Sequence, residues 1–273
     1  MLETLLYERR AGVGVLTLNR PSRKNAINTR MLGEFLTVLD EIDADPETSV
    51  LVVTGAEGSF CSGFDLQEQM ERRPVGVGTW RDILRKDFDG IMRFWSLTKP
   101  VIAAVEGYCL AAGFELALAC DITFAASNAV FGEPELKFGA GIVVMLLPWI
   151  VGAKRAKEII LSGADDIGAH AAFEMGIVNR VVEPGEVLTR SMELGRRIAT
   201  IDPGLLRQTK RALNRTFEIM GLGEALEAAL DIDLHIEGEG IAAKREFMDI
   251  ARRDGMRAAI AWRDARFRPA GGE

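Results

Sequence analysis

Short apolar segments alternate with amphipathic stretches along the first two thirds of the chain. Apolar residues at helical spacing predict helices over about 28–45 and 79–97, and a short helix over 66–70. Between them lie short, β-rich segments with few polar residues, which is typical of strands buried on both faces. These predicted strands are 14–18, 50–54, 101–105 and 121–125, with a further short strand at 130–131. Buried strands that alternate with helices favour a parallel α/β arrangement.

The pattern changes beyond Gly152, where amphipathic helices predominate around one strand-like segment at 177–182. From Asp202 to Phe267 the spacing predicts helices only. Their apolar surface is too large for a loose tail, so we expect it to pack on the core or on another subunit. We therefore divide the chain into a core, 1–200, and a C-terminal helical region for packing and oligomerisation, 201–273, whose last residues, 268–273, are expected to be disordered.

The segment 101–121 is almost wholly apolar and contains one carboxylate of special interest, Glu115. Its first part is a predicted strand, and small residues lead from there into a predicted buried helix that has Glu115 near its start. A carboxylate in such surroundings costs several kcal/mol unless it is paired or its pKa rises. Position alone leaves two interpretations open: a partner of the helix dipole or of a buried arginine, or a catalytic group.

Composition excludes several classes of protein. The chain has 273 residues, 48% of them hydrophobic, and a net charge of -7, which argues against a nucleic-acid footprint over the whole surface. The three cysteines, Cys61, Cys109 and Cys120, show no CxxC spacing and sit among apolar residues, which favours reduced, buried thiols. No stretch has the length and flanks of a membrane span or a signal peptide, so we expect a cytoplasmic protein with no membrane partner.

Common catalytic motifs are missing from the sequence. It contains no complete dinucleotide fingerprint, no GxxxxGK[ST] loop and no HExxH pair. His170 and His235, the two histidines of the chain, both fall in predicted helices, so neither a histidine triad nor a metal centre is expected. Any catalysis must therefore rest on carboxylates and backbone donors.

Five blocks of sequence carry a resemblance to a known family. They are NRPSRKNAIN, TGAEGSFCSGFDL, KPVIAAVEGYCLAAGFELALACDITFAA, FGEPELKFG and LSGADDIGAHAAFEMGIVNRVV, in this order between Asn19 and Val182. Together they resemble the crotonase, or enoyl-CoA hydratase/isomerase, superfamily. The resemblance implies an α/β fold, a crotonase-like spiral of ββα turns followed by a C-terminal helical region, which assembles as a homotrimer or hexamer.

The resemblance also implies roles for the residues of the reaction. Two backbone N–H groups that hold the thioester oxygen of an acyl-CoA fall on Phe64 and Ala112, and two catalytic carboxylates fall on Glu115 and Glu135. Glu115 would activate water and Glu135 would donate the proton, although Glu135 could also be an ordinary loop carboxylate after a proline. Glu133 is a nearby third acid without an assigned role.

For coenzyme A, the resemblance implies contacts from two loops. Lys24 or Arg23 suits a phosphate group, and Asp65 could equally be a helix cap. No separate cofactor is expected, because coenzyme A is part of the acyl-CoA substrate. The implied contact residues are Arg23, Lys24, Ala26, Ser62, Asp65 and Leu66.

Two departures from the family pattern keep other functions open. Alanines stand at 111 and 112, where many hydratases have glycines, and the segment AGIVVMLLPW, 140–149, replaces a stretch with Pro and Gly-Gly-Thr. The main hypothesis is an enoyl-CoA hydratase that adds water to a 2-enoyl-CoA. The alternatives are an enoyl-CoA isomerase or other acyl-CoA enolate chemistry, and a catalytically silent CoA-binding or scaffold protein.

Overall fold

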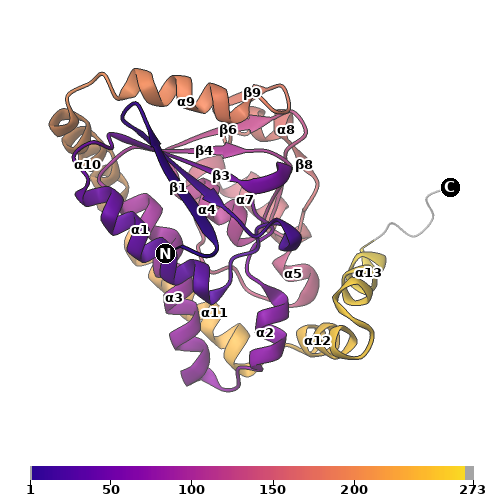
Figure 1. The fold of residues 1–273 in the computed structure, drawn as a ribbon. Coiled ribbons are helices and arrows are strands. Elements are labelled where there is room, and N and C mark those ends of the chain that lie inside the picture. The colour runs from indigo at the N-terminus through magenta and orange to yellow at the C-terminus, as the bar shows by residue number, and fades with distance from the viewer. Residues whose placement is uncertain (1, 268–273) are drawn as a thin grey trace.

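The computed structural model describes residues 2–267 and is built around a six-stranded sheet with the strand order β1-β2-β3-β4-β6-β9 (Figure 1). From β2 to β9 all neighbouring strands are parallel, which confirms the predicted parallel α/β core. The strands are β1 (Leu5–Arg10), β2 (Val13–Leu18), β3 (Val50–Gly55), β4 (Val101–Val105), β6 (Ile122–Ala126) and β9 (Arg180–Val182).

Two parts of the sheet structure differ from the sequence prediction. Strand β1 was not predicted, because its polar residues face outward at the sheet edge and break the apolar pattern; it pairs antiparallel with β2. A second sheet of three strands contains β5 (Tyr108–Leu110), β7 (Val130–Gly132) and β8 (Ile167–Gly168), and β8 runs antiparallel to β7. Of the predicted strand 177–182, only the last three residues form one.

Both faces of the large sheet are covered, as the apolar strands predict. On one face, Val52, Ile102 and Phe124 pack against α9 (Val187–Ile198), which crosses the sheet at the top of Figure 1. The other face belongs to the main core, together with α1 (Thr29–Ala44), α3 (Val77–Ser96) and α11 (Leu222–Glu239). Helix α11 packs against α3, so the C-terminal helical region contributes to this core.

The prediction that only helices follow Asp202 is confirmed within the described residues. Besides α11, they are α10 (Pro203–Ile219), α12 (Ala242–Asp254) and α13 (Met256–Arg266). The segment 268–273, expected to be disordered, lies outside the described residues. The remaining helices are α2 (Leu66–Arg72), α4 (Ala112–Ala119), α5 (Glu135–Phe138), α6 (Leu147–Val151), α7 (Ala153–Ser162) and α8 (Ala169–Glu174), with 3-10 turns at Pro21–Arg23 and Ala56–Gly58.

Helix α10 lies at the surface and is fixed by a buried lysine. The Lys210 ammonium donates hydrogen bonds to Asp121 at 2.7 Å and to the Lys99 carbonyl at 3.0 Å. Several apolar side chains of this helix and its C-terminus are exposed: Leu205, Leu213, Ile219 and Met220. Among residues 2–267, no helix has the length and apolar character needed to cross a membrane.

Candidate active site

The first element of the site is the buried helix α4, which carries Glu115 in its first turn. Every residue of α4 is buried, and Glu115 is only 1% exposed. Its Oε1 accepts a hydrogen bond from the Val144 amide at 3.1 Å. Its Oε2 is buried without a hydrogen-bond partner among the described residues. The carboxylate is therefore anchored at one oxygen and free at the other. Among residues 2–267 no arginine pairs with it, so the buried-arginine interpretation is not supported, whereas its place in the first turn of α4 still fits an interaction with the helix dipole.

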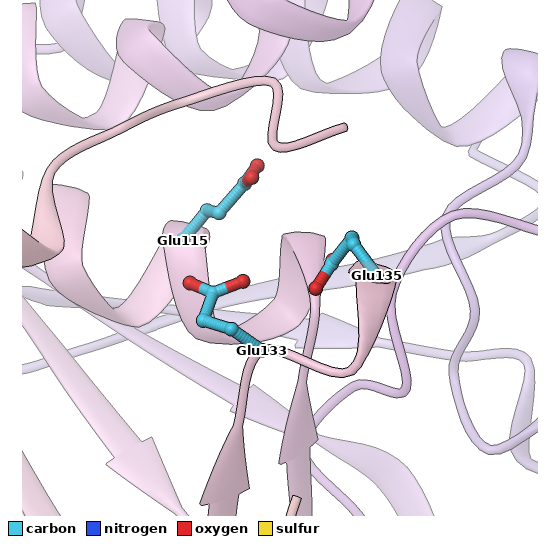
Figure 2. A group of neighbouring side chains, drawn as sticks. All are labelled: Glu115, Glu133 and Glu135. Atoms are coloured by element: carbon cyan, nitrogen blue, oxygen red, sulfur yellow. The ribbon is translucent and has the colours of Figure 1, made fainter. Parts of the chain in front are cut away.

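Two further carboxylates reach the same place from the segment after β7. Glu133 follows the end of this strand, and its amide is fixed by a 2.8 Å hydrogen bond to the Ala164 carbonyl. Glu135 begins the short helix α5, so it is not simply a loop residue. Figure 2 shows Glu115 rising from α4 while Glu135 points toward Glu133. One oxygen from each of the three lies within 4.8 Å of one from the others.

The pKa values of the three carboxyls are all raised, chiefly because burial removes water from the charged form. For Glu115 and Glu133, repulsion by Glu135 adds to this effect and raises the pKa well above the usual range. For Glu135 the pKa rises to about 7, and a hydrogen bond with Glu133 works against the rise. Three carboxyls this close cannot all ionise, so the cluster holds protons at neutral pH and titrates as a unit.

Two backbone amides lie together beside Glu115. Gly63 has a φ of 98°, and a Cβ at this position would lie 2.6 Å from the Ala111 Cβ and 3.4 Å from the Ala112 nitrogen, so the Ser62–Asp65 turn presses against the start of α4. Within residues 2–267, neither the Phe64 nor the Ala112 amide donates a backbone hydrogen bond. At Ala112 this follows from its position at the start of a helix. Two unused donors are therefore available next to the carboxylates.

Ala111 carries backbone strain at this junction. Its φ of 56° and ψ of -135° lie in a region that side chains with a Cβ rarely adopt. Its amide donates to the Gly132 carbonyl at 2.9 Å, which ties the entry of α4 to the end of β7. The extra methyl group expected at position 111 lines the cavity described next.

A cavity of about 690 Å³ connects these groups with the predicted coenzyme A residues. Glu115, Glu135 and Phe64 line it, whereas Glu133 and the side chain of Ala112 are buried next to lining residues. All six predicted contact residues line it too: Arg23, Lys24, Ala26, Ser62, Asp65 and Leu66. The structure thus brings the catalytic and coenzyme A predictions into one site.

Within that set, Asp65 has a structural task. Its Oδ1 accepts hydrogen bonds from the Gln67 and Glu68 amides at 3.1 and 3.2 Å, and its Oδ2 pairs with Arg20 at 2.7 Å. The alternative interpretation of this residue as a helix cap is therefore confirmed. By contrast, Lys24 has its ammonium 5.9 Å from the centre of the Tyr108 ring, a contact that leaves it available for a ligand.

Known proteins share this sequence and architecture. The enoyl-CoA hydratase/isomerase family matches residues 8–242. A short-chain-enoyl-CoA hydratase of Clostridium acetobutylicum is 35% identical over 95% of both chains, and a mevalonyl-coenzyme A hydratase of Aspergillus fumigatus is 36% identical over 80% of both. A crystal structure of an enoyl-CoA hydratase/isomerase from Xanthobacter autotrophicus Py2 is 57% identical, with a TM-score of 0.97 over 99% of this chain and 100% of that one. The chain belongs to the enoyl-CoA hydratase/isomerase family. The predicted family and fold class are confirmed.

The departure from the family pattern at 140–149 forms part of the site. Ala140, Gly141 and Val143 line the cavity, and the Val144 amide holds Glu115. Gly141 contacts the Asp233 carboxylate so closely that a Cβ would not fit, and its amide donates to Glu237 at 3.4 Å. This segment therefore joins Glu115 to helix α11.

Several polar residues of the cavity were missed in the sequence, among them Asp165, Arg263 and Asp264 and a group of four. Asp87 comes from α3, Asp233 and Glu237 from α11, and Lys244 from α12, and we call these four residues the polar wall. Asp233 and Glu237 are one helical turn apart, so their spacing could have indicated a shared face. The same helix also carries Asp231 and Glu239, which are exposed. Acidic residues of a helix are usually solvated, so the spacing of Asp233 and Glu237 did not indicate that they line a cavity.

The three clustered glutamates are also the residues best suited to a metal ion, since carboxylate oxygens are ligands of hard cations. Their raised pKa values mean that protons compete for the same oxygens at neutral pH. This chemistry favours proton transfer over metal binding at the cluster.

Proposed function

We propose that this member of the family is an enoyl-CoA hydratase, which adds water to the double bond of a 2-enoyl-CoA thioester. The observation that carries the proposal is the pair of buried carboxylates, Glu115 and Glu135, that face one cavity beside two unused backbone amides. Relatives whose names state hydratase activity, at 35% and 36% identity, support it.

In this mechanism the two carboxylates have opposite tasks. Glu115 takes a proton from water through its unpaired Oε2 while the water oxygen bonds to Cβ. The electrons of the double bond move to the thioester oxygen, and the Phe64 and Ala112 amides stabilise the enolate by about 3 kcal/mol each. Glu135 then gives a proton to Cα, so that one water has been added overall. Because the carboxyls titrate as a unit, the proton retained by the cluster at neutral pH belongs to the group and not to one residue, so an ionised Glu115 can act as base while a protonated Glu135 acts as acid.

Glu133 has a supporting task in this scheme. It is 1% exposed, stays behind the cavity wall and hydrogen-bonds to Glu135. The hydrogen bond between the two raises the pKa of Glu133 and lowers that of Glu135, as expected if a protonated Glu133 donates to Glu135. We assign it the positioning of Glu135, through which it influences the proton donor without touching substrate.

The coenzyme A portion of the substrate extends along the loops that contain Lys24 and Ser62. The cationic side chains of Arg23 and Lys24 suit its phosphate groups. The turn from Ser62 to Leu66 offers backbone contacts to the pantetheine arm. Ala26 provides a small side chain at the cavity edge.

We also propose assembly into a trimer or hexamer. The exposed apolar side chains of α10 and its C-terminus support this, since contiguous apolar surface commonly marks an interface. Light scattering at micromolar concentration should give three or six times the 29.9 kDa chain mass. A monomeric mass would contradict the proposal.

The activity is tested by incubating purified protein with short, long and aromatic 2-enoyl-CoAs while recording loss of the conjugated thioester absorbance. We expect turnover to 3-hydroxyacyl-CoA with at least one of them. Calorimetry with acetoacetyl-CoA and free acetoacetate provides an independent measurement, in which the thioester should bind more tightly. Binding without turnover would favour a silent CoA-binding protein, and conversion of a 3-enoyl-CoA without hydroxyacyl product would favour an isomerase.

A further inference from the structure

The polar wall is an unusual lining for a site that accepts an acyl chain. Asp233, Glu237 and Lys244 are each less than 10% exposed and line the same cavity as the catalytic glutamates. Asp233 contacts Gly141, in the segment whose Val144 amide holds Glu115, and its charge raises the pKa of both Glu115 and Glu135. The wall therefore faces the acyl part of the substrate, where proposed hydration takes place.

Within the wall, Glu237 and Lys244 satisfy one another. The Lys244 ammonium forms an ion pair with Glu237 and lies 4.6 Å from the centre of the Trp80 ring. The other oxygen of Glu237 accepts from the Gly141 amide at 3.4 Å. This pair is thus built into the protein and leaves little capacity for a ligand.

Asp233 differs from that pair. It is 2% exposed, yet both of its carboxylate oxygens lack a hydrogen-bond partner among residues 2–267. Burial and the charge of Glu237 raise its pKa to about 7, against the opposing charge of Lys244. A buried carboxyl without a partner is costly, and such groups in proteins are nearly always satisfied. Because Asp233 lines the cavity, a polar group of the substrate that enters it can supply this hydrogen bond.

The neighbours of Asp233 restrict what that partner is. An apolar acyl chain would leave both oxygens unpaired. A terminal carboxylate would add another negative charge to a group of acids in which burial already raises the pKa of Asp87 to about 8 and that of Asp233 to about 7. An ammonium group would meet the charge of Lys244. A hydroxyl group can donate to an ionised Asp233 or accept from a protonated one. Apolar side chains complete the lining and suit the methylene groups of such a chain: Leu84, Phe138, Met256 and Ile260.

We propose that the polar wall is a subsite for a hydroxyl group on the acyl chain of the substrate, with Asp233 as its hydrogen-bond partner. This inference rests on the proposed hydratase activity and names its substrate class, a hydroxylated 2-enoyl-CoA. A site built to hydrogen-bond a hydroxyl group discriminates against the analogue that lacks it, because the buried carboxyl is then left unpaired. We expect a preference of about 10-fold or more in kcat/KM.

The experiment compares four thioesters of equal chain length: 2-hexenoyl-CoA and its 4-, 5- and 6-hydroxy derivatives. With the wild-type enzyme, at least one hydroxy derivative should be hydrated about 10-fold faster than 2-hexenoyl-CoA in kcat/KM. If none of the three hydroxy derivatives had a higher kcat/KM than 2-hexenoyl-CoA, the inference would be overturned. A 6-amino derivative serves as a fifth substrate, and a preference for it over every hydroxy derivative would identify a cationic ligand in place of a hydroxyl group.

Variants then test the residue. Asp233→Leu should abolish the preference: the ratio of kcat/KM for the preferred hydroxy substrate to kcat/KM for 2-hexenoyl-CoA should fall about 10-fold. Both substrates are compared at the pH optimum of each enzyme, because the charge of Asp233 also raises the pKa of Glu115 and Glu135. The matched control is Asp231→Asn, an exposed residue of the same helix, which should keep the wild-type preference. Equal losses on both substrates in Asp233→Leu would contradict the assignment.

A binding measurement separates this inference from the proposed activity. Calorimetry with hexanoyl-CoA and the preferred hydroxyhexanoyl-CoA needs no turnover. Tighter binding of the hydroxy compound by wild type, and not by Asp233→Leu, would uphold the subsite even if no hydration were found. Hydration without any hydroxyl preference would uphold the activity and overturn the subsite.

Discussion

The two parts of the cavity are built in different ways. The reacting end, by which we mean Glu115, Glu133, Glu135 and the Phe64 and Ala112 amides, comes from tight turns and short elements between residues 61 and 138. These parts are locked by backbone contacts, such as Gly63 against Ala111 and the bond from the Ala111 amide to Gly132. The polar wall comes instead from side chains of three separate helices, α3, α11 and α12. The reacting end is held rigidly and determines the reaction. Side chains of the polar wall can be exchanged more easily, so this part of the cavity can determine which substrate is preferred.

The largest effect is expected from removing either catalytic carboxylate. Glu115→Gln and Glu135→Gln should each lower kcat for hydration by about 10²- to 10⁴-fold with little change in affinity, because each removes a proton transfer made in the transition state. Rates and substrate dissociation constants measured for both variants provide the test. Glu224→Gln, an exposed residue in the first turn of α11, is the control.

These variants also distinguish hydration from isomerisation. An isomerase can move one proton between Cα and Cγ with a single carboxylate, so one variant would be inactive and the other nearly normal on a 3-enoyl-CoA. Near-normal hydration in both would place the chemistry elsewhere in the cavity. Either result would end the assignment of the reacting end to hydration.

The same contrast explains what the sequence could predict. The reacting end is encoded in contiguous blocks such as SGFD and FGEPE, where glycines and small residues sit beside the functional positions. The structure confirms that these blocks converge, and also that the strands 50–54 and 101–105 are buried. The chemical roles of the residues remain predictions.

The polar wall could not be predicted, because its residues meet through the packing of α11 on α3 and of α12 beside them. Asp87 and Asp233 are distant in the sequence, and each resembles a solvated residue of an amphipathic helix. Strand β1 was missed for a related reason: as an edge strand it lacks the apolar pattern of its neighbours. Long-range packing decided both cases.

The second prediction concerns pH at the reacting end. If Glu135 is the proton donor, kcat/KM for hydration should fall on the alkaline side of neutral pH, where the cluster loses the proton that this residue donates. Glu133→Leu should move this fall to higher pH, because the hydrogen bond from Glu133 lowers the pKa of Glu135. Initial rates between about pH 5.5 and 9 give the profiles.

Glu224→Gln should leave the wild-type profile in place. An unchanged or downward-shifted limb in Glu133→Leu would argue against the positioning role of Glu133. The experiment thus tests whether the reacting end behaves as a single titrating unit.

The third prediction concerns the stability of the polar wall. The pKa of Asp233 rises from 3.8 to about 7 on folding, so the folded state binds more protons between these values and stability falls as pH rises through this window. Asp233→Asn removes the cost of the buried charge. Relative to wild type, it should gain about 1–3 kcal/mol in unfolding free energy at pH 8 and almost nothing near pH 4.

Denaturant unfolding at a series of pH values measures this difference. Asp231→Asn provides the comparison, since an exposed aspartate should give no pH-dependent gain. An equal gain in unfolding free energy at pH 4 and pH 8 would show that ionisation of Asp233 does not destabilise the folded protein.

The smallest effect is expected at Ala111, which joins helix α4 to the reacting end. Its φ of 56° strains any residue with a Cβ, whereas glycine adopts this conformation freely. Ala111→Gly should therefore relieve about 1–3 kcal/mol of strain, of which about 0.4–1 kcal/mol is offset by the larger entropy of glycine in the unfolded chain. A net gain near 1 kcal/mol corresponds to a rise in Tm of about 2–4 °C.

Ala112→Gly is the matched control: this neighbour is helical and buried, so the same change should lower Tm. If both variants lowered Tm equally, the strain at Ala111 would not be stored in the folded protein, and the rigid turn at the reacting end would need another explanation.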